Sequence, residues 1–110
     1  PEKLTSVETM IAGGEVVDLK QSISVFLKNR KSIFVHAYGP TENTTFTTCA
    51  LIKNPLRQSQ RIPIGSPISN TFVYILDSNM KPCPINVPGV LYTTGEGLAR
   101  GYINNESLTH

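Results

Sequence analysis

The sequence predicts a mixed α/β fold, in which a half with strands and a helix precedes a β-rich half. In the first half, two short apolar runs at residues 7–12 and 32–35 flank a segment with helical spacing. In the second half, turn residues separate short apolar runs. Because residues 53–61 form a polar connection between the two, we expect residues 1–60 to be part of an α/β subdomain and residues 61–110 part of a β-rich subdomain.

The first predicted strand leads into Gly13 and Gly14. Two glycines allow a ligand to approach the main chain closely, although they are equally suited to a simple turn before a helix. The helix is expected from Asp18, which can act as its cap, because apolar residues then recur at helical spacing: Leu19, Ile23, Phe26 and Leu27. Basic residues at its end complement the helix dipole, so we assign this helix no function.

Residues 36–46, HAYGPTENTTF, concentrate more functional groups than a plain connecting loop needs. Tyr38 and Gly39 fall where the second strand ends. Pro40 suits the start of a helical turn, whose positive end then carries Thr41 and Glu42 and would stabilise an anion or a metal-bound phosphate. In the alternative interpretation, the hydroxyls and the carboxylate only satisfy backbone N–H groups of a helix start. These residues alone favour neither interpretation.

The remaining elements are predicted to be mainly strands. Residues 46–52 are β-branched and apolar, which makes Cys49 a core residue, whereas the prolines and glycine of residues 62–68 exclude a regular central strand. Residues 72–76 and 89–93 are two further strands that suggest a meander. Cys83, which stands between two prolines, is expected to be an exposed bystander.

The last motif, Gly95-Glu96-Gly97-Leu98-Ala99-Arg100-Gly101-Tyr102, predicts glycine-bracketed turns around a short helical piece. We expect Arg100 to have an architectural role, as a partner of a carboxylate or a carbonyl group.

Composition excludes several classes of function. The chain has 110 residues, 39% of them hydrophobic, and a net charge of +2 with scattered basic residues, so no nucleic-acid surface is predicted. No apolar run approaches membrane-spanning length, and the two cysteines lack the close spacing of zinc sites. These features fit a reducing, cytoplasmic context without membrane contact. The start, Pro1-Glu2-Lys3-Leu4, suggests an internal cut in a longer chain.

Three strings together resemble one family. They resemble motifs of adenylate-forming enzymes, in the spelling typical of nonribosomal peptide synthetase adenylation domains. The strings are Tyr-Gly-Pro-Thr-Glu at residues 38–42, an Ile-Gly-x-Pro pattern at residues 64–67 and Gly-Leu-Ala-Arg-Gly-Tyr at residues 97–102. The motifs appear in the family's order over residues 10–109. One departure is Gly89-Val90-Leu91, where the family usually has Gly-Glu-Leu, so this strand lacks the carboxylate of the family's usual polar contact.

The resemblance implies a fragment of the large N-terminal part of such an enzyme, spanning the end of its α/β subdomain and part of its β-rich subdomain. Such enzymes use ATP and Mg²⁺ to convert a carboxylic acid into an acyl-adenylate, and then pass the acyl group to the phosphopantetheine thiol of a carrier-protein domain. The implied partners are therefore an amino acid, a carrier protein, and the remaining adenylation and neighbouring synthetase domains.

The resemblance also assigns roles to single residues. Tyr38 and Gly39 would lie beside the adenine, Thr41 would contact phosphate, and Glu42 would hold the magnesium ion, so that Thr41 and Glu42 carry the catalytic role. The border of the adenine site would be completed by Gly13, Gly14 and Glu15. The pocket for the substrate side chain would be lined by Ile11, Gly13, Ala37, Thr45 and Phe46. Because this lining is apolar and uncharged, it favours a branched aliphatic amino acid.

Several family elements are absent from the 110 residues: the glycine-rich phosphate loop with its lysine, the Thr-Gly-Asp motif, the aspartate that holds the substrate amino group, and the catalytic lysine of the C-terminal domain. The isolated chain is therefore expected to be inactive. Two alternatives stay open: another acyl-activating ligase, such as an acyl-CoA synthetase, or a non-catalytic scaffold or interaction module.

Overall fold

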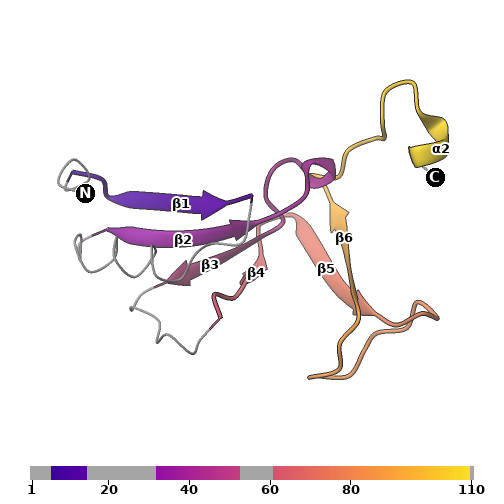
Figure 1. Ribbon diagram of the computed structural model, residues 1–110, viewed down its shortest axis with the longest axis horizontal. Coiled ribbons are helices and arrows are strands. Elements are labelled where there is room, and N and C mark those ends of the chain that lie inside the picture. The colour runs from indigo at the N-terminus through magenta and orange to yellow at the C-terminus, as the bar shows by residue number, and fades with distance from the viewer. Residues whose placement is uncertain (1–5, 15–31, 53–60, 110) are drawn as a thin grey trace.

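The computed structural model describes residues 6–14, 32–52 and 61–109, which form two β-sheets and little helix (Figure 1). The predicted helix from Asp18 and the predicted adenine-border residue Glu15 lie outside the described residues. The first sheet has the strand order β1-β2-β3-β4, and the second pairs β5 with β6. The mixed α/β class predicted from the sequence is confirmed.

The first sheet is built around β2 (Ile33–Tyr38), which lies between β1 (Thr9–Gly13) and β3 (Thr48–Ile52). β1 runs parallel to β2, in the register that places Thr9 opposite Ile33 and Gly13 opposite Ala37. β3 runs antiparallel to β2. A parallel pair requires a crossover connection between its strands, which is the arrangement typical of α/β folds.

The buried core of the described residues follows this central position of β2. Phe34, His36 and Ala37 on β2 are buried, as is Ala50 on β3. The imidazole of His36 is accommodated because its Nδ1 donates to the carbonyl oxygen of Pro63 at 2.8 Å, which satisfies a polar group in the core.

One edge strand of the first sheet is β4 (Ser66–Pro67), which pairs with β3 through two residue positions. Proline lacks a backbone donor and is therefore tolerated at an edge. Gly65, directly before β4, has a φ of +84°, and a Cβ atom there would lie 1.9 Å from the carbonyl oxygen of Cys49. The prediction that residues 62–68 form no regular central strand is confirmed.

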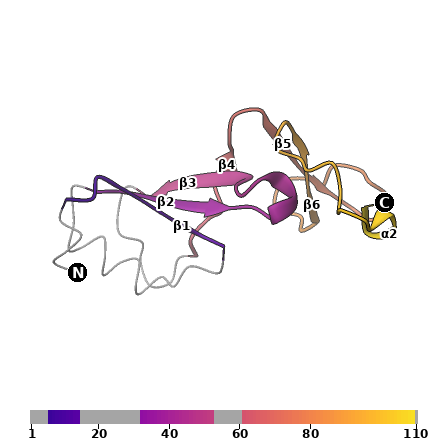
Figure 2. The same ribbon diagram turned by 90° about the horizontal axis from the view of Figure 1, so that it is seen from above.

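The second sheet is an antiparallel pair of β5 (Thr71–Leu76) and β6 (Val90–Gly95), with Tyr74 opposite Tyr92. Both predicted strands exist, although the described part of this sheet is a pair and not a meander. The chain passes from the first sheet to the second between β4 and β5. The two sheets lie beside each other along the long axis, with the turn that follows β2 between them (Figures 1 and 2).

Two predictions about local structure are wrong. Residues 97–100 form no helical piece, because the backbone N–H of Ala99 donates to the carbonyl oxygen of Glu42 at 2.7 Å instead of to its own segment. The helix after this motif is α2 (Glu106–Thr109). The two cysteines are half-buried free thiols, so that Cys49 is less buried and Cys83 more buried than expected.

The helices among the described residues are too short to cross a membrane.

Candidate functional site

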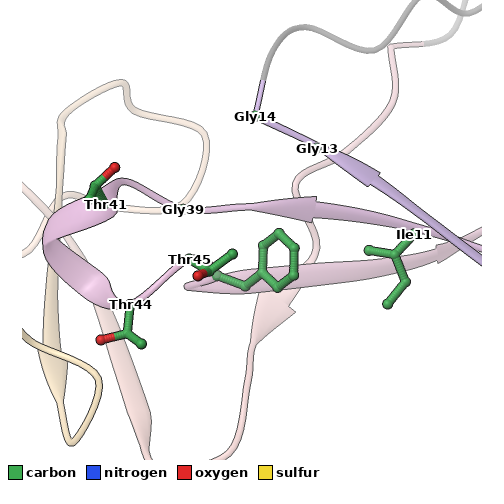
Figure 3. A pocket seen from close by; sticks show the side chains of 8 residues that line it. Ile11, Gly13, Gly14, Gly39, Thr41, Thr44 and Thr45 are labelled. Carbon is green, nitrogen blue, oxygen red and sulfur yellow. The ribbon is translucent and has the colours of Figure 1, made fainter.

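A pocket of about 670 Å³ lies at the carboxyl ends of β1 and β2 (Figure 3). Since β1 and β2 are parallel, their carboxyl ends meet at one edge, which is where α/β sheets bind ligands. Its lining comes from the end of β1 and from the turn after β2: Ile11, Gly13, Gly14, Gly39, Thr41, Thr44, Thr45 and Phe46.

Glycine is required at two of the lining positions by backbone packing. A Cβ atom at Gly13 would lie 2.0 Å from the carbonyl oxygen of Ala37, and one at Gly39 would lie 2.6 Å from the backbone N of Thr47. Gly14 differs, because its φ is +91° and a Cβ atom there would meet no atom of the described residues within 4 Å. The main chain at Gly14 is therefore open to a ligand.

The turn after β2 holds the side chains that the motif predicted to be functional. Pro40 is extended, with φ −79° and ψ 160°, and the 3₁₀ helix η2 (Thr41–Asn43) follows it. Pro40, at the N-cap of η2, makes no side-chain capping hydrogen bond. Thr44 and Thr45 then adopt φ values of 47° and 73°. Positive φ is rare for β-branched residues and strains the backbone, and such strain is often found beside binding sites.

The turn is anchored from inside by Asn43, which is 1% exposed. Its Nδ2 donates to the hydroxyl oxygen of Thr47 at 2.8 Å and to that of Thr93 on β6 at 3.2 Å. Its Oδ1 is buried and has no hydrogen-bond partner among the residues that the structure describes. Asn43 therefore ties the turn of the first sheet to the second sheet. Sequence reasoning missed this residue, because no local pattern shows that the position after Glu42 is buried.

The motif at residues 95–102 packs against the same turn. Thr44 Oγ1 donates to the carbonyl oxygen of Gly97 at 2.6 Å, and the N–H of Ala99 bonds to the Glu42 carbonyl. The Tyr102 hydroxyl donates to the Glu42 carboxylate at Oε1. Two strings that are far apart in the sequence thus form one structural unit around Thr41 and Glu42.

The carboxylate of Glu42 is exposed and ionised at neutral pH. The hydrogen bond from Tyr102, followed by one from the backbone N–H of Glu42 itself, lowers the pKa of Glu42 below its usual value. The same contact with Glu42 raises the pKa of Tyr102. An ionised, accessible carboxylate fits magnesium, which prefers hard oxygen ligands.

No three His, Cys, Asp or Glu side chains gather into a metal cage within the described part of the chain. Magnesium is usually held by one or two carboxylates together with water and substrate phosphates. A single carboxylate beside a pocket is therefore a suitable donor set for a magnesium ion that arrives with a nucleotide.

The structure brings most of the predicted site residues together, and it leaves three of the described ones outside the pocket lining. Ala37 is 1% exposed and lies between Gly13 and Cys49 in the sheet. Tyr38 ends β2 opposite Thr48 and is exposed, and the Glu42 side chain bonds to Tyr102. The predicted residues that do line the pocket are Ile11, Gly13, Gly14, Gly39, Thr41, Thr45 and Phe46. Their individual roles stay predictions.

Comparison with known proteins agrees with this geometry. Residues 1–103 match the family model described as AMP-binding enzyme. The chain is 44% identical over 109 residues to tyrocidine synthase 3 of Brevibacillus parabrevis, an alignment that covers 99% of this chain and 2% of that protein. It is 39% identical over 106 residues to bacitracin synthase 1 of Bacillus licheniformis, which covers 96% of this chain and 2% of that protein. The chain therefore spans only a small part of the length of these relatives.

Solved structures share the fold. One is PA1221, a nonribosomal peptide synthetase protein containing adenylation and PCP domains, with a TM-score of 0.90, 31% identity, and coverage of 97% of this chain and 22% of that chain. Another is AB3403, a four-domain nonribosomal peptide synthetase bound to AMP and glycine, with a TM-score of 0.79 and 32% identity. The match covers 93% of this chain and 7% of that chain. The chain belongs to the AMP-binding enzyme family, and it has the fold of part of a nonribosomal peptide synthetase adenylation domain.

Proposed function

We propose that this chain is a segment of an adenylation domain that forms an aminoacyl-adenylate from ATP and an amino acid, and loads the aminoacyl group onto a carrier-protein thiol in nonribosomal peptide synthesis. The observation that carries the proposal is the pocket at the carboxyl ends of β1 and β2, because residues of the adenylation motifs line it. The AMP and glycine bound to AB3403, and the PCP domain of PA1221, support an adenine nucleotide, an amino acid and a carrier-protein domain as the binding partners here.

The pocket has a polar and an apolar part, which suit the two substrates. Gly13, Gly14 and Gly39 expose main chain, and the Thr41 hydroxyl can donate to a phosphate oxygen. With Tyr38 next to Gly39 at the end of β2, these residues would border the nucleotide. Glu15, which follows Gly14 in the sequence, would complete that border.

Glu42 and Thr41 are the residues that would act on the phosphates. Bound magnesium would neutralise the negative charge of the triphosphate, and Glu42 is the carboxylate that would hold it. Thr41, in the first turn of η2, would keep a phosphate group in position while the carboxylate of the amino acid attacks the α-phosphate and pyrophosphate leaves.

Ile11, Thr45 and Phe46 make the apolar part of the pocket, and we propose that it takes a branched aliphatic side chain such as that of valine, leucine or isoleucine. A charged side chain would lose its hydration there without gaining a partner. Gly13 adds no side chain to the lining, and the buried Ala37 lies opposite it on the neighbouring strand β2. We further propose a cytoplasmic enzyme of secondary metabolism, since free cysteines suit a reducing compartment.

Amino-acid-dependent exchange of pyrophosphate into ATP, measured on the complete domain, tests the reaction and its substrate. We expect valine, leucine and isoleucine to support exchange, and aspartate, lysine, ornithine and tryptophan to support little. A clear preference for the second group contradicts the substrate proposal. Exchange supported only by fatty acids, with transfer to coenzyme A, favours the other acyl-activating ligases.

Glu42→Gln tests the phosphate site. We expect a fall in exchange rate on the order of a hundredfold, the scale for one preorganised electrostatic group, with little change in the melting temperature. Glu106→Gln, which makes the same change at an exposed position in α2, is the matched control and should be neutral. If Glu42→Gln unfolds readily while its folded fraction turns over normally, Glu42 has only a local structural role.

A further inference from the structure

The carboxylate of Glu42 is held by a residue that neither the pocket nor the motif at residues 38–42 contains. The Tyr102 hydroxyl donates to Glu42 Oε1 across a sequence separation of 60 residues. We infer that Tyr102 is a positioning residue that fixes the Glu42 carboxylate for binding of the divalent cation. This inference rests on the proposed function, in which Glu42 holds that cation.

Tyr102 is itself fixed by the chain on both sides of it. Its backbone N–H donates to Thr109 Oγ1 at 3.0 Å, and that hydroxyl donates to the carbonyl oxygen of Asn105 at 2.9 Å. Gly101 has a φ of +145°, and a Cβ atom there would lie 2.5 Å from Thr109 Cγ2. The loop and α2 therefore set the position from which the phenol reaches Glu42.

The same segment also fixes the backbone of Glu42. The N–H of Ala99 donates to the Glu42 carbonyl at 2.7 Å, and Thr44 Oγ1 bonds to Gly97. Backbone and side chain of Glu42 are thus both held by residues 97–102. A carboxylate has about four lone-pair sites, so one hydroxyl donor restricts its rotation and leaves sites for a metal ion.

A role in cation binding explains the contact better than a role in packing. Tyr102 is 42% exposed, so its ring is only partly buried, and packing of the ring does not account for the hydrogen bond of its hydroxyl. In contrast, hydrogen bonds to a metal-ligating carboxylate commonly tune metal affinity, and their loss costs about 10–100-fold in affinity or activity. Exchange of Tyr102 for phenylalanine removes the hydroxyl and keeps the ring.

The test uses the complete adenylation domain and Mn²⁺ as the cation probe. Binding of Mn²⁺ in the presence of ATP, without amino acid, is measured by electron paramagnetic resonance, together with the Mg²⁺ dependence of exchange. In Tyr102→Phe we expect the apparent dissociation constant of Mn²⁺ to rise about 10–100-fold. The exchange rate should recover to near wild type at saturating Mg²⁺, with the melting temperature unchanged. Tyr74→Phe on β5, which makes the same change away from the turn, should alter none of these values.

The outcomes separate this inference from the function on which it rests. If Tyr102→Phe leaves Mn²⁺ affinity within about twofold of wild type while Glu42→Gln abolishes binding, the inference is wrong and the proposed function stands. A loss of rate in Tyr102→Phe that added Mg²⁺ does not restore, with a lowered melting temperature, also overturns it and indicates packing. If Glu42→Gln changes neither Mn²⁺ binding nor exchange, the cation role of Glu42 in the proposed function fails first.

Discussion

The exchange of Asn43 for alanine should destabilise the domain by about 2 kcal/mol, because Asn43 is the buried link between the two sheets. The change removes the hydrogen bonds to Thr47 and Thr93, at 2.8 and 3.2 Å, which together contribute roughly 2 kcal/mol. The vacated space adds on the order of 1 kcal/mol. Deletion of Oδ1 offsets about 1 kcal/mol, since this buried acceptor has no partner among residues 6–14, 32–52 and 61–109 and therefore costs stability.

The measurement is the free energy of unfolding by urea of the complete domain, with Asn79→Ala in the exposed β5–β6 connection as the matched control. Thr93→Val removes the partner across the sheets, so the Asn43→Ala and Thr93→Val pair should show a coupling energy of about 1 kcal/mol. Effects of Asn43→Ala no larger than those of Asn79→Ala, or a coupling energy of zero, would refute the view that Asn43 links the sheets.

Two further predictions concern the pocket and the chain as a whole. Gly13→Ala should lower stability by about 1–3 kcal/mol, because its Cβ would lie 2.0 Å from the Ala37 carbonyl oxygen; equal melting temperatures for wild type and Gly13→Ala would contradict the register of β1 and β2. The isolated chain should show no pyrophosphate exchange, because it lacks the phosphate loop and the C-terminal lysine of the family; exchange at a rate near that of a complete domain would disprove this.

The strands were predictable because their signal is local. Runs such as Phe72–Leu76 are β-branched and apolar, and the turn residues around them mark where they end. The strand ends were harder to predict. β2 continues through His36 to Tyr38, beyond the apolar run, because His36 pairs with both β1 and β3 and Tyr38 pairs with Thr48 on β3. Pairing with neighbouring strands decides where a strand ends, and the sequence of the strand alone does not show this pairing.

The candidate site was predictable only in its lining. Gly13, Gly14 and the motif at residues 38–42 carry local signals, and the resemblance gave them roles. The roles of Asn43 and Tyr102 were not predicted, because their contacts with Thr93 and Glu42 span 50 and 60 residues of sequence. The helical piece expected at residues 97–100 failed for the same reason, since the Ala99 N–H bonds to the distant Glu42 carbonyl.

These long-range contacts explain how a strained turn persists. Thr44 and Thr45 hold positive φ values, and each such residue costs roughly 1–3 kcal/mol. Besides the bond from Tyr102 to the Glu42 carboxylate, three hydrogen bonds join the turn to the second sheet and the segment after it: Asn43 to Thr93, Thr44 to Gly97 and Ala99 to Glu42. At about 1 kcal/mol each, they offset a strain of similar size. The second sheet and the segment after it are therefore part of the site, because they hold the strained backbone that presents Thr41 and Glu42.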